Sequence, residues 1–493
     1  MSISQTITDF VTLAIQAGGW MELDRLYLQN RVLAMIGEES LDSVSPTTVT
    51  KTSLELLDEL VDRAIKNSII QQGSVDLESF EAQLMDFLTP PPSVVNALFA
   101  QHYEKDPADA TDYFYKLSKE NDYIKTRAIA KNIVFSAETE YGPLEITINL
   151  SRQEKEPKQI AAAHQVTQAD YPKCVLCMEN EGYKGRANYP ARTNHRVIRM
   201  NLDGESWGFQ YSPYAYYNEH SIILSEEHRP VMISKETFRR LTRIIEVLPH
   251  YFVGSNADLP IVGGSILMHD HYQAGRHIFP MERAEIEHYF ELNDFPLMNA
   301  GLVKWPMSVI RLQSPNSEDL VEAATLILEK WRNYSDESVS IRAFSEDGTP
   351  HHTITPIARR KGQLFELDLV LRDNNTSAEH PDGIFHPHPE VQHIIKENIG
   401  LFEVMGLAVL PPRLNDELQE VEKYVLGKEN RIADYHKEWA NQMKKDYSLK
   451  EGNAKEVIQQ EVGKIFARVL ADAGVYKRTE EGHKAFKRFI DSL

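Results

Sequence analysis

Two histidines stand two residues apart, His269 and His271, in the segment ILMHDHYQAGRHIFPM (266–281), and Gln273 follows two residues later. In an extended chain, residues i and i+2 face the same way, so we expect these three side chains to lie side by side. Imidazoles in such an arrangement can bind a metal or attack an electrophile. The alternative is a chance pair, because the chain has 18 histidines and HPHP at 386–389 repeats the spacing.

The only two cysteines, Cys174 and Cys177, form a C-x-x-C motif, and two cysteines cannot build a disulfide framework. The pair could be a redox couple, two buried thiols, or half of a tetrahedral metal site. A redox motif usually opens a helix after a strand, whereas PKCVLCMENEGYKG (172–185) is typical of a turn. The motif therefore favours a metal site that needs two further ligands.

A basic window without acidic residues, YKGRANYPARTNHRVIR (183–199), interrupts a chain whose net charge is −20. Guanidinium groups match phosphate oxygens in geometry, so the window indicates a local phosphate site. A solvated positive face is the alternative. The basic residues are Lys184, Arg186, Arg192, Arg196 and Arg199.

The bulk properties of the chain exclude several classes of protein. An acidic chain lacks the basic face that general nucleic-acid or anionic-membrane binding needs. No run of about 18 apolar residues could span a bilayer. The start, MSISQTITDF, has no basic region before an apolar stretch, so it does not resemble a signal peptide. We therefore expect a cytoplasmic protein with local anion binding.

The elements that must position these residues follow from hydrophobic periodicity. Residues 1 to about 135 look helical, as in TSLELLDELVDRAIKNSI (52–69), and TPPPS (89–93) should start a further helix. From about 143 the chain mixes strand-like and helical runs, and the last 80 or so residues return to charged helical patterns. The fold class predicted is α+β. The strand-like runs include PLEITINLS, HSIILS (220–225) and FELDLVLRD (365–373), and the later helical ones SKETFRRLTRIIEVL (234–248) and NAKEVIQQEVGKIFARVL (453–470).

Together, the ordered motifs resemble the galactose-1-phosphate uridylyltransferases of the histidine-triad superfamily, and more closely their second, bacterial class. The motifs are CVLC, GRANYPARTNHR, WGFQYSPY, SEEHRP, HDHYQ, HHTITPIAR (351–359) and NNTSAEHPDGIFHP (374–387). They cover residues 174 to 412 densely. The resemblance implies two histidine-triad-like domains with antiparallel sheets and packed helices, a helical N-terminal extension and a helical C-terminal tail. The expected divisions are 1–135, 136–290, 291–412 and 413–493.

The resemblance also implies a role for each site residue. His271 would be the nucleophile that carries UMP, and Gln273 would donate to a phosphate oxygen. A structural zinc would be held by Cys174, Cys177, His228 and His269. The nucleotide contacts would be Asn194, Asn256 and Ser265, and Glu403 would contact hexose hydroxyls. Asp270 replaces the proline that the first class has between its two histidines, and extended geometry should turn it to the face opposite His271.

The reaction implied is exchange of UMP between UDP-glucose and galactose 1-phosphate, which gives UDP-galactose and glucose 1-phosphate, in a homodimer. The nitrogen of His271 that attacks must carry no hydrogen, so the other nitrogen should donate to a fixed acceptor such as a backbone carbonyl. A histidine-triad hydrolase or a dinucleotide phosphorylase is the enzymatic alternative, although Gln273 favours a transferase. A non-catalytic, zinc-organised nucleotide binder is the third.

Overall fold

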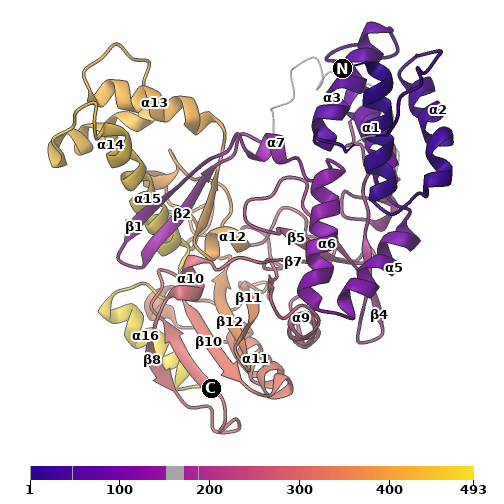
Figure 1. Ribbon diagram of the computed structural model, residues 1–493. Coiled ribbons are helices and arrows are strands. Elements are labelled where there is room, and N and C mark those ends of the chain that lie inside the picture. The colour runs from indigo at the N-terminus through magenta and orange to yellow at the C-terminus, as the bar shows by residue number, and fades with distance from the viewer. Residues whose placement is uncertain (1, 47, 152–170, 187) are drawn as a thin grey trace. The chain divides into compact units, whose positions relative to one another are not determined.

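The computed structural model describes residues 2–46, 48–151, 171–186 and 188–493. The chain divides into two compact units (Figure 1). Unit 1 comprises Met1–Ala130, Arg152–Ala215 and Glu219–His228, and unit 2 comprises Lys131–Ser151, Tyr216–Asn218 and Arg229–Leu493.

Unit 1 begins with a group of helices packed around an apolar core. In α3 the Thr52 side chain accepts from the Glu55 backbone N–H and the Glu55 carboxylate accepts from the Thr52 N–H, which is a capping box. Leu56, Leu60 and Ala64 recur at four-residue steps and are fully buried, so one face of the helix joins the core. The α-helices in the described residues of unit 1 are α1 (Ile3–Gln16), α2 (Arg25–Met35), α3 (Ser53–Lys66), α4 (Leu77–Met85), α5 (Pro92–Tyr103), α6 (Pro107–Glu120) and α7 (Thr126–Ile129).

The strands of unit 1 form an antiparallel meander, β3 (Ile198–Leu202), β4 (Glu205–Tyr211) and β5 (Ser221–Ser225). Residues 207–211 of β4 are all buried, so this part of the strand has no solvent face. His228 follows β5 after two residues, and the C-x-x-C turn precedes the meander in the chain.

Unit 2 is built on an antiparallel sheet in which the strands follow one another in the order β7, β6, β11, β12, β10, β9, β8. Helices α9 (Lys235–Val247) and α11 (Ser317–Arg332) lie side by side and contact β11 (Figure 1). The long hairpin of β11 and β12 is buried along nearly its whole length. The strands are β6 (Phe252–Gly254), β7 (His271–Gly275), β8 (Ile286–Phe290), β9 (Asn299–Val303), β10 (Val309–Ser314), β11 (His352–Lys361) and β12 (Leu364–Asp373).

A smaller sheet of unit 2 joins β1 (Ile133–Thr139) and β2 (Gly142–Ile148) in an antiparallel hairpin, and β13 (Leu407–Leu410) pairs parallel to β2. Helix α15 (Ala454–Ala473) packs on this hairpin. The remaining helices are α10 (Pro280–Arg283), α12 (Leu401–Val404), α13 (Arg413–Val425), α14 (Asp434–Asp446) and α16 (Glu480–Ile490).

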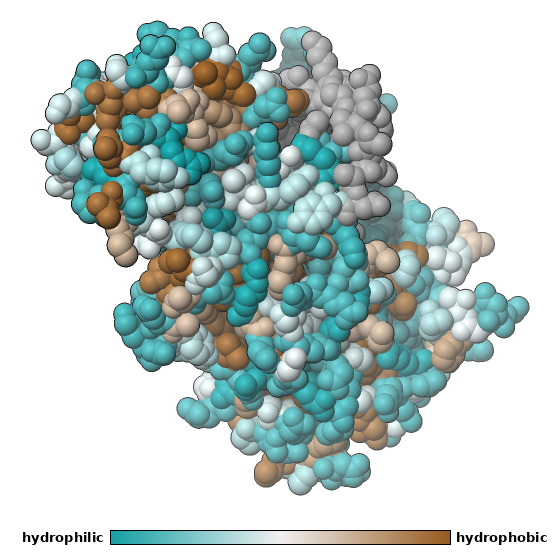
Figure 2. Space-filling model, turned by 90° about the vertical axis from the view of Figure 1, so that its right-hand side faces the viewer, coloured by the Kyte–Doolittle hydropathy of each residue, from teal (hydrophilic) through white to brown (hydrophobic). Residues whose placement is uncertain are grey.

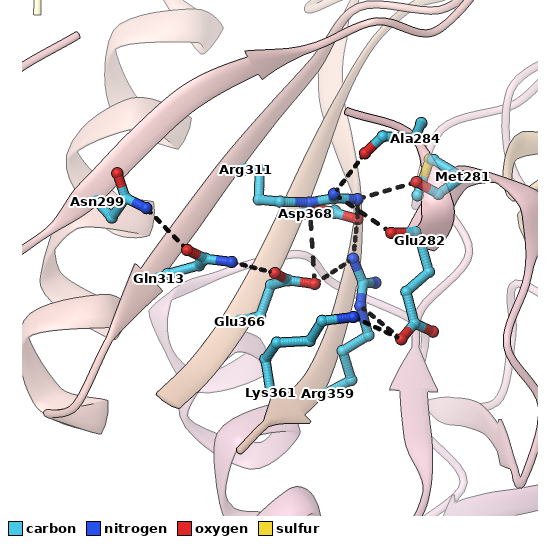
Figure 3. Close-up of polar contacts among 10 residues, drawn as sticks. All are labelled: Met281, Glu282, Ala284, Asn299, Arg311, Gln313, Arg359, Lys361, Glu366 and Asp368. Carbon is cyan, nitrogen blue, oxygen red and sulfur yellow. Dashed lines mark hydrogen bonds and ion pairs between the residues drawn. The ribbon is translucent and has the colours of Figure 1, made fainter. Parts of the chain in front are cut away.

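A buried ion network ties α10 to the sheet of unit 2 (Figure 3). Arg311 on β10 binds Asp368 on β12 with two hydrogen bonds, of 2.7 and 2.9 Å. Its remaining N–H groups donate to the Met281, Ala284 and Glu282 carbonyls, at 2.9, 3.0 and 3.4 Å. Arg359 contacts Asp368 at 2.6 Å. Since a buried charge is costly unless paired, the network fixes how α10 meets the strands.

Replacing Arg311 by alanine should lower the free energy of unfolding by about 3 kcal/mol, because Asp368 would remain buried without its bidentate partner. Lys361→Ala, which removes a cation that is 55% exposed and 3.6 Å from Glu282, should cost less than about 1 kcal/mol. Urea unfolding of both variants measures the difference. Equal losses would contradict the role given to the buried network.

The α+β class, the antiparallel strands and the helical terminal regions are confirmed. The helix expected at 52–69 is α3, and the helix expected to start in TPPPS is α5, which begins at Pro92. The strands expected at 220–225 and 365–373 are β5 and β12. The division at 135, 290 and 412 stays a prediction. No helix of the described residues is both long and apolar enough to cross a membrane.

On the face drawn in Figure 2, hydrophilic residues predominate and hydrophobic ones form scattered patches. The large hydrophobic side chains most exposed to solvent include Met21 and Leu23, on the short stretch before α2. A polar surface agrees with the net charge of −20.

Candidate functional site

His271 is the first residue of β7 and its side chain is buried, with 8% of the residue exposed. Its Nδ1 lies 2.6 Å from the backbone oxygen of His269. A carbonyl oxygen can only accept, so Nδ1 carries the hydrogen and Nε2 of the neutral ring presents a lone pair. Burial, the largest influence, lowers the pKa of His271 to about 4. The hydrogen bond expected from the sequence is therefore present.

Gln273 lies two residues further along β7, on the same face of the strand as His271. It is partly exposed and stands opposite Gly254 of β6 in the strand register. The expectation that His269 also lies in the extended segment is not met, because the strand begins only at His271 and His269 sits in a bend before it, fully buried. The backbone there turns so that the His269 carbonyl reaches the His271 ring.

Asp270 is held by two arginines of unit 2. Its backbone N–H donates to the Arg229 carbonyl at 2.6 Å. Its carboxylate lies 3.5 Å from Nε of Arg229 and 3.8 Å from a guanidinium nitrogen of Arg240. The negative charge that replaces the family proline is therefore balanced locally.

Asn256 and Glu403 meet at the start of α12. Oδ1 of Asn256 accepts from the Leu401 N–H at 2.9 Å, and Oε2 of Glu403 accepts from the Gly400 N–H at 3.2 Å. Asn256 lies two residues beyond Gly254, the register partner of Gln273. Burial raises the pKa of Glu403 to about 7, against backbone hydrogen bonds that lower it. Unit 2 thus gathers the predicted phosphate, nucleotide and hexose contacts at one end of β6 and β7.

The two other predicted nucleotide contacts lie in different surroundings. Ser265 is exposed, in the segment that leads to His269. Asn194 belongs to unit 1, is 3% exposed, and its Nδ2 donates to the Asn121 backbone oxygen at 2.7 Å. The Asn121 amide donates in return to the Asn194 carbonyl at 2.8 Å. The Nδ2 group of Asn194 therefore already has a hydrogen-bond acceptor within unit 1.

A group of cysteine and histidine side chains has the composition of a metal site. Cys174 and Cys177 have their sulfurs 3.5 Å apart, too far for a disulfide bond of about 2.05 Å. Sγ of Cys177 lies 3.1 Å from Nδ1 of His228. These three residues and His269 make up the one group of the described residues that could hold a metal ion. Two sulfurs on a tetrahedral zinc, each at about 2.3 Å, would lie about 3.8 Å apart, so the pair fits that ion.

Two arginines of the basic window are engaged in structural ion pairs. Arg196 is buried and lies 2.8 Å from Asp86, and Arg199 lies 2.6 Å from Glu181. These two charges are therefore neutralised within unit 1. The acidic partners lie outside the window (183–199), so its composition alone could not reveal them.

Asp258 and Asn374, which no sequence motif singles out, anchor the segment between Asn256 and Ser265. Asp258 precedes LPIVGG (259–264), whose proline and two glycines are typical of a turn. That composition is the sequence feature that could have indicated a structured loop here. The third histidine of the opening segment, His277, lies 2.8 Å from the Glu145 carboxylate and is accounted for by that contact.

Comparisons with known proteins identify the family to which the chain belongs. The family model described as "Galactose-1-phosphate uridyl transferase, N-terminal domain" matches residues 19–230, and the corresponding C-terminal domain model matches residues 244–441. The chain is 60% identical to the galactose-1-phosphate uridylyltransferase of Enterococcus faecalis, over 99% of this chain and 98% of that one. It is 56% identical to that of Streptococcus mutans, over 98% of each.

These relatives are nucleotidyltransferases, and at this identity over nearly the full length the chain is an enzyme of that class. It belongs to the galactose-1-phosphate uridylyltransferase family. Among solved structures, yeast Ap4A phosphorylase Apa2 in complex with Ap4A is 14% identical, with a TM-score of 0.33 over 59% of this chain and 84% of that one. That likeness is too weak to carry an argument.

Proposed function

We propose that this chain exchanges UMP between UDP-glucose and galactose 1-phosphate through a covalent uridylyl-His271 intermediate, releasing glucose 1-phosphate and then UDP-galactose. The observation that carries the proposal is the hydrogen bond from Nδ1 of His271 to the His269 carbonyl, because it leaves Nε2 with a lone pair. Membership of the galactose-1-phosphate uridylyltransferase family supports the choice of substrates.

In the first half-reaction, Nε2 of His271 attacks the α-phosphorus of UDP-glucose. The bond from that phosphorus to the bridging oxygen breaks, and glucose 1-phosphate leaves with the electron pair. The ring becomes positive as the N–P bond forms, and the His269 carbonyl stabilises it through Nδ1–H. In the second half-reaction, a phosphate oxygen of galactose 1-phosphate attacks the same phosphorus, the N–P bond breaks, and UDP-galactose leaves.

The remaining site residues would bind and orient. Gln273 would donate its amide to a non-bridging oxygen of the transferring phosphate. Oδ1 of Asn256 is used by Leu401, so its Nδ2 would face the nucleotide, with Ser265 and Asn194 as further contacts. Glu403 would accept from hexose hydroxyls.

Cys174, Cys177, His228 and His269 would hold zinc, whose preference for sulfur and imidazole donors in a tetrahedral set matches these four residues. With four protein ligands the ion would have no open position, so it would stabilise the segment that leads to His271 and supply no reaction step. The expected homodimer stays a prediction.

Removing the metal should lower the melting temperature by several degrees, because a structural ion stabilises only the folded state. A chelator is added to the wild type and to the Cys174→Ser/Cys177→Ser variant, with elemental analysis of both. The variant should already melt low and should not respond. If the melting temperature of the wild type stays unchanged after verified loss of zinc, the two cysteines are packed thiols and the ion does not stabilise the fold.

The function is tested with UDP-glucose labelled in the uracil ring and no acceptor. We expect an acid-labile label on the protein and one glucose 1-phosphate released per label. Adding galactose 1-phosphate should then move the label into UDP-galactose. Release of free UMP without a sugar acceptor would instead favour the hydrolase, and binding without exchange would favour the nucleotide binder.

A further inference from the structure

The segment that joins Asn256 to Ser265 is tightly wound. Ala257 and Gly263 face each other as an isolated β-bridge, so the chain returns on itself within six residues. A Cβ added at Gly263 would lie 2.6 Å from the Leu259 carbonyl oxygen and 2.7 Å from that of Ala257, which no side chain tolerates. Only glycine fits this closure.

Ile261, at the tip of this loop, has a φ of 73°. A β-branched residue in the left-handed region is strained, and such a conformation persists only where the surroundings fix it. Gly383 packs against it, since a Cβ on Gly383 would lie 3.2 Å from Cγ2 of Ile261. The loop is therefore held in a conformation that its own sequence disfavours.

The first anchor of the loop is Asp258, whose side chain is only 11% exposed. Its Oδ2 accepts from the Ile233 N–H at 2.8 Å, next to the start of α9. Its Oδ1 accepts from the hydroxyl of Thr353 on β11. Arg332, at the end of α11, lies 3.8 Å from the carboxylate. One side chain thus joins the loop to two helices and a strand.

The second anchor is Asn374, whose Nδ2 donates to the Pro260 carbonyl at 3.3 Å. That carbonyl can only accept, so the orientation of the amide is fixed and Oδ1 faces His351. Nδ1 of His351 donates to Oδ1 at 2.7 Å, and the Ser345 hydroxyl donates to Nε2 at 2.5 Å. Each donor in this chain of hydrogen bonds therefore meets an acceptor.

We propose that Ala257–Gly264 is a preorganised loop, held under strain by Asp258 and Asn374 so that Asn256 and Ser265 are placed for the nucleotide before it arrives. Asp258 and Asn374 are positioning residues, and the inference rests on the proposed function because that function assigns the nucleotide to this loop. A loop ordered in advance spares the ligand the entropic cost of ordering it. Loss of an anchor therefore weakens nucleotide binding and leaves the chemistry of His271 and Gln273, on β7, in place.

Asp258→Ala is expected to raise KM for UDP-glucose, and Kd measured by calorimetry, about tenfold with kcat within about twofold of the wild type. The matched control is Asp336→Ala. Asp336 accepts from a backbone N–H and a hydroxyl, both of Ser338, and from Arg488, so it has the same kinds of partner as Asp258. Both variants should melt lower, and only Asp258→Ala should change KM.

Ile261→Gly separates positioning from stability. Glycine adopts positive φ without strain, so the melting temperature should stay level or rise, while the loosened loop raises KM for UDP-glucose. Wild-type KM values in both Asp258→Ala and Ile261→Gly would overturn the inference. A wild-type protein that does not bind UDP-glucose would instead overturn the proposed function, so the two failures are distinguishable.

Discussion

Replacing His271 by alanine is expected to abolish labelling of the protein by uracil-labelled UDP-glucose and to lower UDP-galactose formation by on the order of 10⁵-fold or more. The only lone pair placed to attack the phosphorus belongs, on the proposed mechanism, to Nε2 of His271. On that mechanism no other part of the site could substitute for it, because both half-reactions pass through the histidine. The measurements are acid-labile label per chain and the steady-state rate.

The matched control is His288→Ala, which removes an exposed histidine of β8 in the same unit. It should label and turn over as the wild type does. UDP-glucose should still bind to His271→Ala, since the nucleotide contacts remain. Equal labelling of His271→Ala and the wild type would end the assignment of this residue as the nucleophile.

Gln273→Ala is expected to lower kcat by about 10²–10³-fold with little change in KM, because a donor aimed at the transferring phosphate acts most strongly in the transition state. The residue is partly exposed and shares its strand face with His271, so removing its side chain should leave β7 intact. Single-turnover kinetics of each half-reaction measure the effect, and both should slow by the same factor.

Two further variants sharpen the test of Gln273. Gln273→Glu should be slower still, since a carboxylate would repel the phosphate oxygens. Gln392→Ala, which removes a glutamine that donates to the Pro387 carbonyl, should leave the rates unchanged. A Gln273→Ala variant within about twofold of the wild type would remove this residue from the proposed mechanism.

Local patterns in the sequence predicted the elements because they depend on local interactions. The apolar residues at three- and four-residue steps in 52–69, among them Leu56, Leu60 and Ala64, predict α3 without knowledge of any neighbour. The turn at Cys174 and Cys177 was visible in the same way. The spacing of His271 and Gln273 fixed their common strand face, since side chains alternate along a strand.

The position at which the extended segment begins, by contrast, depends on how the folded chain bends before β7, where the His269 carbonyl turns back to the ring of His271. This is why the expectation that His269 also belonged to the strand failed. Arg196 and Arg199 looked available for phosphate in the sequence, but Asp86 and Glu181 occupy them. The sequence does not indicate which opposite charges form ion pairs when the two residues are far apart in the chain.

The sequence by itself determined the residue types, the ordered motifs and the strand face that support a uridylyltransferase with a nucleophilic His271, because these depend on side-chain chemistry and short-range geometry. Only the tertiary structure decided which nitrogen of His271 carries no hydrogen and where Asp258 and Asn374 anchor the Ala257–Gly264 loop. A hydrogen bond needs donor and acceptor within about 3 Å, and only the folded chain brings such residues to that distance.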